Sequence, residues 1–275
     1  MTSLSHATEV RSWLEQLGVE RMIVISPHLD DAVFSVAGIL GACRDRAEVI
    51  TVFTEGSAGQ NDAWARMTGF PDSAAEHLAR RQEDALAMTQ LGCGFQHLGC
   101  RPGGADDHAV AQAVDAMTQS RPDGLTRTLV LLPAGAGGPT PSTPFSRLAW
   151  RLLRRPWGCM PHGEHELTRD LFWQALSGSQ ARLGFYAELP YAWSHSNRAL
   201  QERLYRLLGC HTELVKYHHD TSEKTHLVEL YASQLNPIFV VAPGAPAFFC
   251  RSTPAVVCRH RRPCGRRCRT LFKCA

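Results

Sequence analysis

The sequence lacks any apolar run approaching the roughly 20 residues that a membrane-spanning helix needs. Its first residues also lack a basic patch followed by an apolar stretch, so we expect no secretory signal and predict a cytoplasmic protein. Charged residues account for only 20% of the 275 residues, whereas apolar residues account for 44%. This balance indicates a chain that buries a large core, and it argues against disorder over most of the length.

Acidic residues are absent after Glu229, and the end of the chain is strongly basic. Residues 251–275 carry seven Arg and one Lys, and the net charge of +3 becomes −5 when these eight charges are removed. Five of the ten cysteines also fall within the last 26 residues. We therefore expect one domain over residues 1–249, followed by a disordered tail over residues 250–275. If the tail is dispensable, truncation at about residue 248 should preserve function.

Two other roles for the tail follow from its composition. Its positive charges favour non-specific contact with phosphates, but the acidic body and the lack of a known binding module make nucleic acid an unexpected partner. The segment 258–268 offers three cysteines and a histidine, yet their spacing matches no known zinc finger. Without a secretory signal, we expect the cysteines elsewhere in the chain to be reduced thiols.

The rest of the chain alternates between short apolar runs and longer helical ones. We expect strands at 21–28, 47–56, 95–100 and 125–135, and helices at 32–46, 73–92 and 106–120. This alternation is typical of βαβ units, so the predicted fold class is α/β, with a Rossmann-like, mostly parallel sheet and helices on both faces. Residues 136–161 are rich in Pro, Gly, Trp and Arg, and they are predicted to form a long loop insertion over the rim where the strands end.

A G-x-G-x-x-G turn is also missing after the strand at 21–28, where a dinucleotide-binding protein would carry it. The sequence there reads ISPHLDDAVFS, with His28, Asp30 and Asp31 between two apolar stretches. Two adjacent carboxylates would repel a pyrophosphate, and they are costly to bury unless a positive group lies between them. The segment therefore argues against a nucleotide site and favours a divalent metal.

A turn after a strand lets residues i and i+3 converge, so His28 and Asp31 are expected to supply two metal ligands. A catalytic zinc usually has three protein ligands and one open position, and HGEH at 162–165 can supply the third ligand. Asp30, left free beside the metal, is a candidate general base. Each motif alone also has a simpler interpretation, because a strand-terminal histidine is often packed and an Asp-Asp pair is often a helix cap.

Together these segments resemble the LmbE/PIG-L family of zinc-dependent deacetylases. PHLDD is similar to the first metal-binding box of the family, and HGEH is similar to the second. The likeness extends to TEGSAG at 54–59, the helix at 80–92, FYAELPYA at 185–192, and Lys224, Tyr231, Ser233 and Gln234. It covers about residues 20–240. The resemblance implies hydrolysis of an N-acetyl group from a glucosamine unit, which releases acetate and a free amine.

The resemblance implies that His28, Asp31 and His165 bind Zn²⁺ and that Asp30 is the general base. One carboxylate and two imidazoles also accept other divalent metals, so the ligand types alone do not select zinc. Leu29 stands where the family usually has proline. This difference leaves the ligand positions unchanged.

Two further residues receive roles from the resemblance. His162 would stabilise the tetrahedral oxyanion or act on the leaving amine. Arg80 would reach substrate hydroxyls, and an exposed ion pair with Glu83 is the alternative that the sequence leaves open. Glu164 replaces an aspartate of the family and keeps a carboxylate that would orient a neighbouring histidine.

Aromatic residues near the expected site bear on the size of the substrate. Trp64, Trp150 and Trp157 are predicted to contact a bulky acceptor that carries the amino sugar, although packing in an ordinary core is the alternative. Some members of the family act on glycopeptide antibiotic intermediates, and others act on small glucosaminyl-inositol substrates. We predict a bulky glycoconjugate substrate, with the small inositol glycoside as the second candidate.

Overall fold

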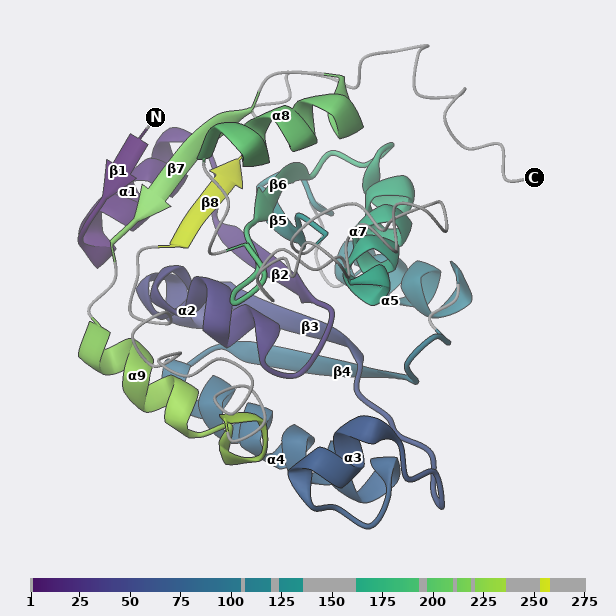
Figure 1. The fold of residues 1–275 in the computed structure, drawn as a ribbon. Helices are drawn as coiled ribbons and strands as arrows, with labels where there is room; N and C mark the ends of the chain where they lie inside the picture. Colours follow the sequence, from purple (N-terminus) through teal and green to yellow (C-terminus); the bar gives the residue numbers. More distant parts are fainter. Residues whose placement is uncertain are drawn as a thin grey trace.

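The computed structural model describes residues 2–104, 107–119, 124–135, 162–192, 197–209, 212–218, 221–235 and 253–257. Within them, eight strands form one sheet: β1 (Thr2–Leu4), β2 (Arg21–Ser26), β3 (Ala47–Phe53), β4 (Gly94–Cys100), β5 (Thr128–Pro133), β6 (Arg182–Tyr186), β7 (Glu213–Tyr217) and β8 (Thr253–Val257). The main helices are α1 (Ala7–Gln16), α2 (Asp31–Cys43), α3 (Ala63–Thr68), α4 (Ser73–Leu91), α5 (Asp107–Gln119), α7 (Gly163–Leu176), α8 (Asn197–Leu208) and α9 (Thr221–Glu229) (Figure 1).

The strand order is β1-β7-β8-β6-β5-β2-β3-β4. Strand β2 pairs in parallel with β3 and β5, and the pairs β3–β4, β5–β6 and β1–β7 are parallel as well. Among the described strands, β8 alone runs antiparallel to its two neighbours, β6 and β7. The prediction of an α/β fold with a mostly parallel sheet is therefore confirmed.

Strand β8 lies in the part of the chain for which we expected a disordered tail. Residues 253–257 pair with Gly184–Tyr186 on one side and with Glu213–Tyr217 on the other. The expectation of disorder after residue 250 is therefore wrong for this segment, whose TPAVV sequence has the β-branched residues of a strand. Truncation at residue 248 would remove an interior strand of the sheet. The rest of the basic tail, residues 258–275, lies outside the described residues.

The apolar run of β2 is buried on both faces of the sheet. Met22 and Val24 belong to a core that also contains residues of α1, α2, α4 and α9, whereas Ile23 and Ile25 belong to a second core with α5, α7 and α8 (Figure 1). Full burial of such a side chain contributes roughly 1.5–3 kcal/mol to the stability of the fold. The unbroken apolar run of β2 therefore favours a central strand with both faces covered. Among the described residues, no helix has both the length and the apolar character required to cross a membrane.

The carboxyl ends of β2, β3 and β5 meet at one rim of the sheet, because these strands are parallel neighbours. The rim therefore gathers the segment after Ser26, the segment after Phe53, and Ala134–Gly135 after β5. Open α/β sheets place ligands at such a rim. The predicted insertion at 136–161, together with Trp150 and Trp157, lies outside the described residues.

Gly56, in the loop after β3, lies so close to the first residue of α4 that a larger residue does not fit there. A Cβ atom at this position would fall directly onto the backbone carbonyl of Ser73, which cannot rotate away as a side chain could. We expect Gly56→Ala to lower the free energy of unfolding by about 3 kcal/mol, at the upper end of typical overpacking costs.

Gly59 of the same loop supplies the matched control for this prediction. Its φ of +72° disfavours alanine, but a Cβ atom there meets nothing within 4 Å, so Gly59→Ala should cost only about 1 kcal/mol. Urea unfolding of both variants measures the difference. Equal losses would show that the contact with Ser73 is not tight in solution.

Candidate metal and catalytic site

The turn after β2 is shaped by hydrogen bonds within the segment 26–32. The Ser26 hydroxyl donates to the carbonyl of His28 (2.7 Å) and accepts from the amide of Ala32 (3.2 Å). The amide of His28 donates to Oδ2 of Asp31 at 3.0 Å. Asp30 occupies the N-cap position of α2, and Asp31 is its first residue. The turn thus brings His28 and Asp31 face to face, as the i, i+3 spacing predicts.

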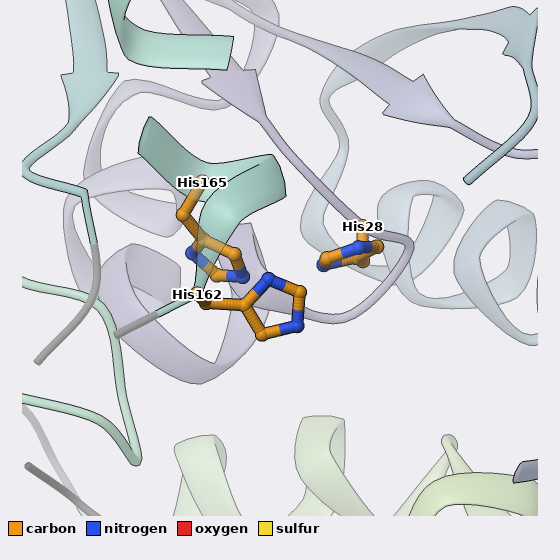
Figure 2. A group of neighbouring side chains, drawn as sticks. All are labelled: His28, His162 and His165. Atoms are coloured by element: carbon orange, nitrogen blue, oxygen red, sulfur yellow. The ribbon is translucent and has the colours of Figure 1, made fainter. Parts of the chain in front are cut away.

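His165 reaches the same point from the start of α7. One oxygen of Asp31, Oδ2, lies 3.1 Å from Nδ1 of His28 and 3.3 Å from Nε2 of His165. The structure therefore brings together the three side chains predicted to be metal ligands. His162 lies beside them, with its ring centroid 4.5 Å from that of His165 and 5.0 Å from that of His28 (Figure 2).

The donor atoms fit a divalent cation. Ring nitrogens of His28, His162 and His165 lie within 4.8 Å of one another, and Oδ2 of Asp31 lies between two of these rings. Nε2 of His165 and Nδ1 of His162 are buried without a hydrogen-bond partner in the described part of the chain. Buried polar atoms rarely stay unpaired, and imidazole and carboxylate groups are common ligands of zinc. The cluster therefore has the composition and the unsatisfied atoms of a metal site.

The adjacent carboxyl groups of Asp30 and Asp31 differ in pKa because their surroundings differ. Burial opposes ionisation of Asp31, but the charges of His165 and His28 and a hydrogen bond from His28 outweigh it and lower the pKa of Asp31 to about 2. Burial raises the pKa of Asp30 to about 6, although the Arg80 guanidinium acts in the opposite direction. In the metal-free protein, Asp31 is therefore a permanent anion, whereas Asp30 titrates close to neutral pH.

The histidines also differ in charge. Burial disfavours the imidazolium of His28, but hydrogen bonds to Asp31 and Glu164 outweigh burial and raise its pKa to about 9. Burial, together with the nearby charges of His28 and His165, lowers the pKa of His162 to about 3. His162 is therefore a neutral imidazole in the metal-free protein, able to donate one hydrogen bond and accept another.

Glu164 contacts a histidine, as the sequence suggested for the second metal-binding box. Its Oε2 lies 2.8 Å from Nε2 of His28, and its Oε1 accepts the amide of Gly103 at 2.9 Å. The contact joins α7 to the turn after β2. It leaves Nδ1 of His28 directed at Asp31.

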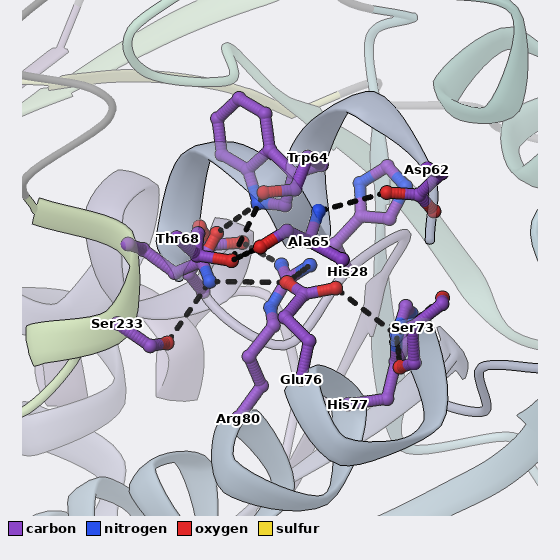
Figure 3. Close-up of polar contacts among 12 residues, drawn as sticks. His28, Asp62, Trp64, Ala65, Thr68, Ser73, Glu76, His77, Arg80 and Ser233 are labelled. Atoms are coloured by element: carbon purple, nitrogen blue, oxygen red, sulfur yellow. Dashed lines mark hydrogen bonds and ion pairs between the residues drawn. The ribbon is translucent and has the colours of Figure 1, made fainter. Parts of the chain in front are cut away.

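Arg80 lies in the site and does not form the alternative ion pair with Glu83. Its guanidinium contacts Oδ1 of Asp30 at 3.3 Å and Oε1 of Glu76 at 3.4 Å, and only 7% of the residue is exposed. Glu83 instead accepts the amide and hydroxyl of Ser233. Figure 3 shows Arg80 and Glu76 extending from α4 toward Trp64.

A cavity of about 410 Å³ opens beside these residues. Its wall includes His28, Asp30, Asp31, Arg80, His162, Trp64, Tyr191 and Gln234. The indole N–H of Trp64 donates to Oε1 of Gln234 at 3.0 Å, which fixes the ring at the cavity wall. Trp64 is therefore placed where we predicted a substrate contact.

Glu188 is a residue of this site that we did not predict. It follows β6 at the same rim, is fully buried, and has Oε1 3.3 Å from Nδ1 of His165. The sequence signal that could have identified Glu188 is an acidic residue directly after a buried strand, in the segment FYAELPYA. The family likeness includes this stretch but gives Glu188 no role, and a single glutamate carries no recognisable spacing.

Residues 23–139 match the PIG-L family, described as GlcNAc-PI de-N-acetylase. The matched region contains His28, Asp31 and Arg80, and it agrees with the resemblance inferred from the sequence. It ends before His165. None of the curated proteins matches the chain significantly.

Several solved structures share the fold. A triple mutant of a deacetylase (Orf2*T) from teicoplanin biosynthesis has a TM-score of 0.60 and 22% identity, covering 86% of this chain and 97% of that one. The A40926 pseudoaglycone deacetylase Dbv21 has a TM-score of 0.59 and 22% identity, with coverages of 86% and 96%. The zinc-inhibited form of teicoplanin deacetylase Orf2 has a TM-score of 0.55 and 24% identity, with coverages of 88% and 99%. At these identities the likeness establishes a common fold.

Proposed function

We propose, on the premise that residues 23–139 match the PIG-L family, that the protein is a metal-dependent N-deacetylase acting on a glucosamine unit. The single observation that carries the proposal is the convergence of His28 and His165 on one oxygen of Asp31, with Asp30 alongside. Three protein ligands and a neighbouring general base are the parts that a zinc-dependent amide hydrolase uses.

The metal would be held by His28, Asp31 and His165. A zinc ion there supplies a Lewis acid for the amide carbonyl and makes water more acidic. Asp30 accepts the proton of the attacking water, and its pKa of about 6 in the metal-free protein leaves the carboxylate ionised at neutral pH. Arg80 orients this carboxylate through its contact with Oδ1.

His162, whose ring lies next to those of His28 and His165, has a second role in the reaction. As a neutral imidazole it donates a hydrogen bond to the carbonyl oxygen as negative charge develops there, and the proton that Asp30 accepted from water passes to the leaving nitrogen. The bond that breaks joins the acetyl carbon to the sugar nitrogen. The products are acetate and a free amino sugar.

For the substrate we propose a bulky glycoconjugate, such as an intermediate of a glycopeptide antibiotic. One deacetylase with the same fold is described as acting in the teicoplanin biosynthetic pathway, and another is described as an A40926 pseudoaglycone deacetylase. Trp64 offers an aromatic wall in the cavity of this protein. A small glucosaminyl-inositol compound is the second candidate, favoured by the name of the matching family. A cytoplasmic location also stays a prediction.

A side-by-side assay of amine release tests both the activity and the substrate. The protein, loaded with one equivalent of zinc, is incubated with an N-acetylglucosaminyl glycopeptide aglycone and with an N-acetylglucosaminyl inositol. We expect faster turnover of the aglycone. Faster turnover of the inositol glycoside would reverse the choice of substrate, and release of amine from neither would contradict the proposed activity.

A further inference from the structure

Glu188 places a fully buried carboxylate against the second histidine of the cluster. Its Oε2 accepts the amide of Ala134 at 3.0 Å, its Oε1 accepts the amide of Gly135 at 2.8 Å, and the same Oε1 faces Nδ1 of His165 at 3.3 Å. An ionised carboxylate is costly to bury unless its oxygens are paired. These contacts provide the pairing, and they join β5, β6 and α7.

The backbone around Glu188 is held from several directions. The amide of Leu189 donates to the Ser35 hydroxyl at 3.1 Å, and the amide of Ala192 donates to the carbonyl of Glu188 at 2.7 Å. The β5 end that donates to the carboxylate is itself held, because Arg169 contacts the carbonyl of Ala134 at 3.0 Å. The carboxylate therefore has little freedom to move away from His165.

This geometry selects one tautomer of His165. A carboxylate has no proton to give, so in the neutral imidazole, the form that binds a metal, Nδ1 must carry the hydrogen between the two groups. Nε2 then presents its lone pair, and it is this atom that faces Oδ2 of Asp31 at 3.3 Å. With the other tautomer, Nε2 would carry a hydrogen and could not bind a metal.

We propose that Glu188 is a positioning residue that holds His165 in the tautomer able to bind the metal through Nε2. The inference rests on the metal site of the proposed function. Carboxylates that orient ligating histidines in this way typically change metal affinity by 10- to 100-fold when removed. Glu188 acts through His165.

Glu188→Gln tests the proposal, because the amide keeps the shape but can donate a hydrogen to Nδ1. We expect zinc affinity, measured by competition with a chromophoric chelator, to fall 10- to 100-fold. Asp84→Asn is the matched control. Asp84 is also buried beside a histidine, with Oδ2 2.8 Å from Nε2 of His97, but it does not contact the proposed ligands. Its variant should keep the zinc affinity of the wild type even where thermal stability falls.

Nitrogen NMR of the zinc-loaded wild type supplies a readout that needs no folded Glu188 variant. The ring shifts of His165, assigned through bonds from its own backbone amide in the zinc-loaded wild type, should show zinc on Nε2 and a hydrogen on Nδ1. Zinc on Nδ1, or a Glu188→Gln protein within threefold of wild-type affinity, would overturn the proposal. Failure of the wild type itself to bind zinc would instead remove the metal site and the proposed function with it.

Discussion

His165→Ala protein, purified without added metal, is expected to contain less than about a tenth of the zinc found in the wild type, with amide hydrolysis reduced at least ~10³-fold. The imidazole of His165 is fully buried and directs Nε2 at the oxygen of Asp31 that also faces His28. Its removal leaves two of the three proposed ligands, which is fewer than catalytic zinc sites usually have. Metal analysis of the purified proteins and amine release under equal zinc provide the measurement.

His162→Ala is the control that separates the two histidines at the start of α7. The ring nitrogens of His162 also lie within 4.8 Å of those of His28 and His165, so three histidines are a competing ligand set. If Asp31 is the third ligand, His162→Ala should keep one zinc per chain and lose about 10²- to 10³-fold in kcat. A metal-free His162→Ala beside a fully loaded His165→Ala would reverse the assignment.

Replacement of Asp30 should abolish most of the activity without loss of metal. Asp30→Asn keeps the shape of the side chain but cannot accept a proton, and loss of a general base typically costs about 10²- to 10⁴-fold in rate. Because the base must be ionised, wild-type kcat/KM should fall as the pH drops through the pKa of Asp30, which is about 6 in the metal-free protein.

Two measurements check this role for Asp30. Zinc content should equal that of the wild type, because Asp30 is not one of the three proposed ligands and its Oδ1 contacts Arg80. The acidic limb of the pH profile should also disappear from the residual activity of the variant. An Asp30→Asn enzyme that is equally active at pH 7 would exclude this residue as the base.

Much of the site follows from local sequence patterns. His28 and Asp31 are joined by a spacing that any turn after a strand brings together, and the apolar run of β2 predicts its central place in the sheet. To place the segment HGEH at the site, one must also assume that a helix begins at this rim. Helix α7 begins there. These features could be predicted because each depends on a few neighbouring residues.

Other parts of the site depend on contacts between distant segments. Arg80 is turned toward Asp30 by the packing of α4 against the turn after β2, which no spacing within α4 reveals. Glu188 acquires its partners only when β5 and β6 pair, because the amides of Ala134 and Gly135 come from the neighbouring strand. β8 was missed because the prediction rested on the composition of the tail as a whole, in which the three β-branched residues Thr253, Val256 and Val257 had little weight.

The position of β8 has a consequence for synthesis of the chain. Ribosomes release proteins from the amino end, so the last described strand emerges after every other strand of the sheet. Until residue 257 has emerged, no strand links β6 to β7. The paired strands β1 and β7 are therefore not yet joined to the rest of the sheet. Open strand edges invite pairing with other chains, so the nascent protein should need protection until residues 253–257 have emerged.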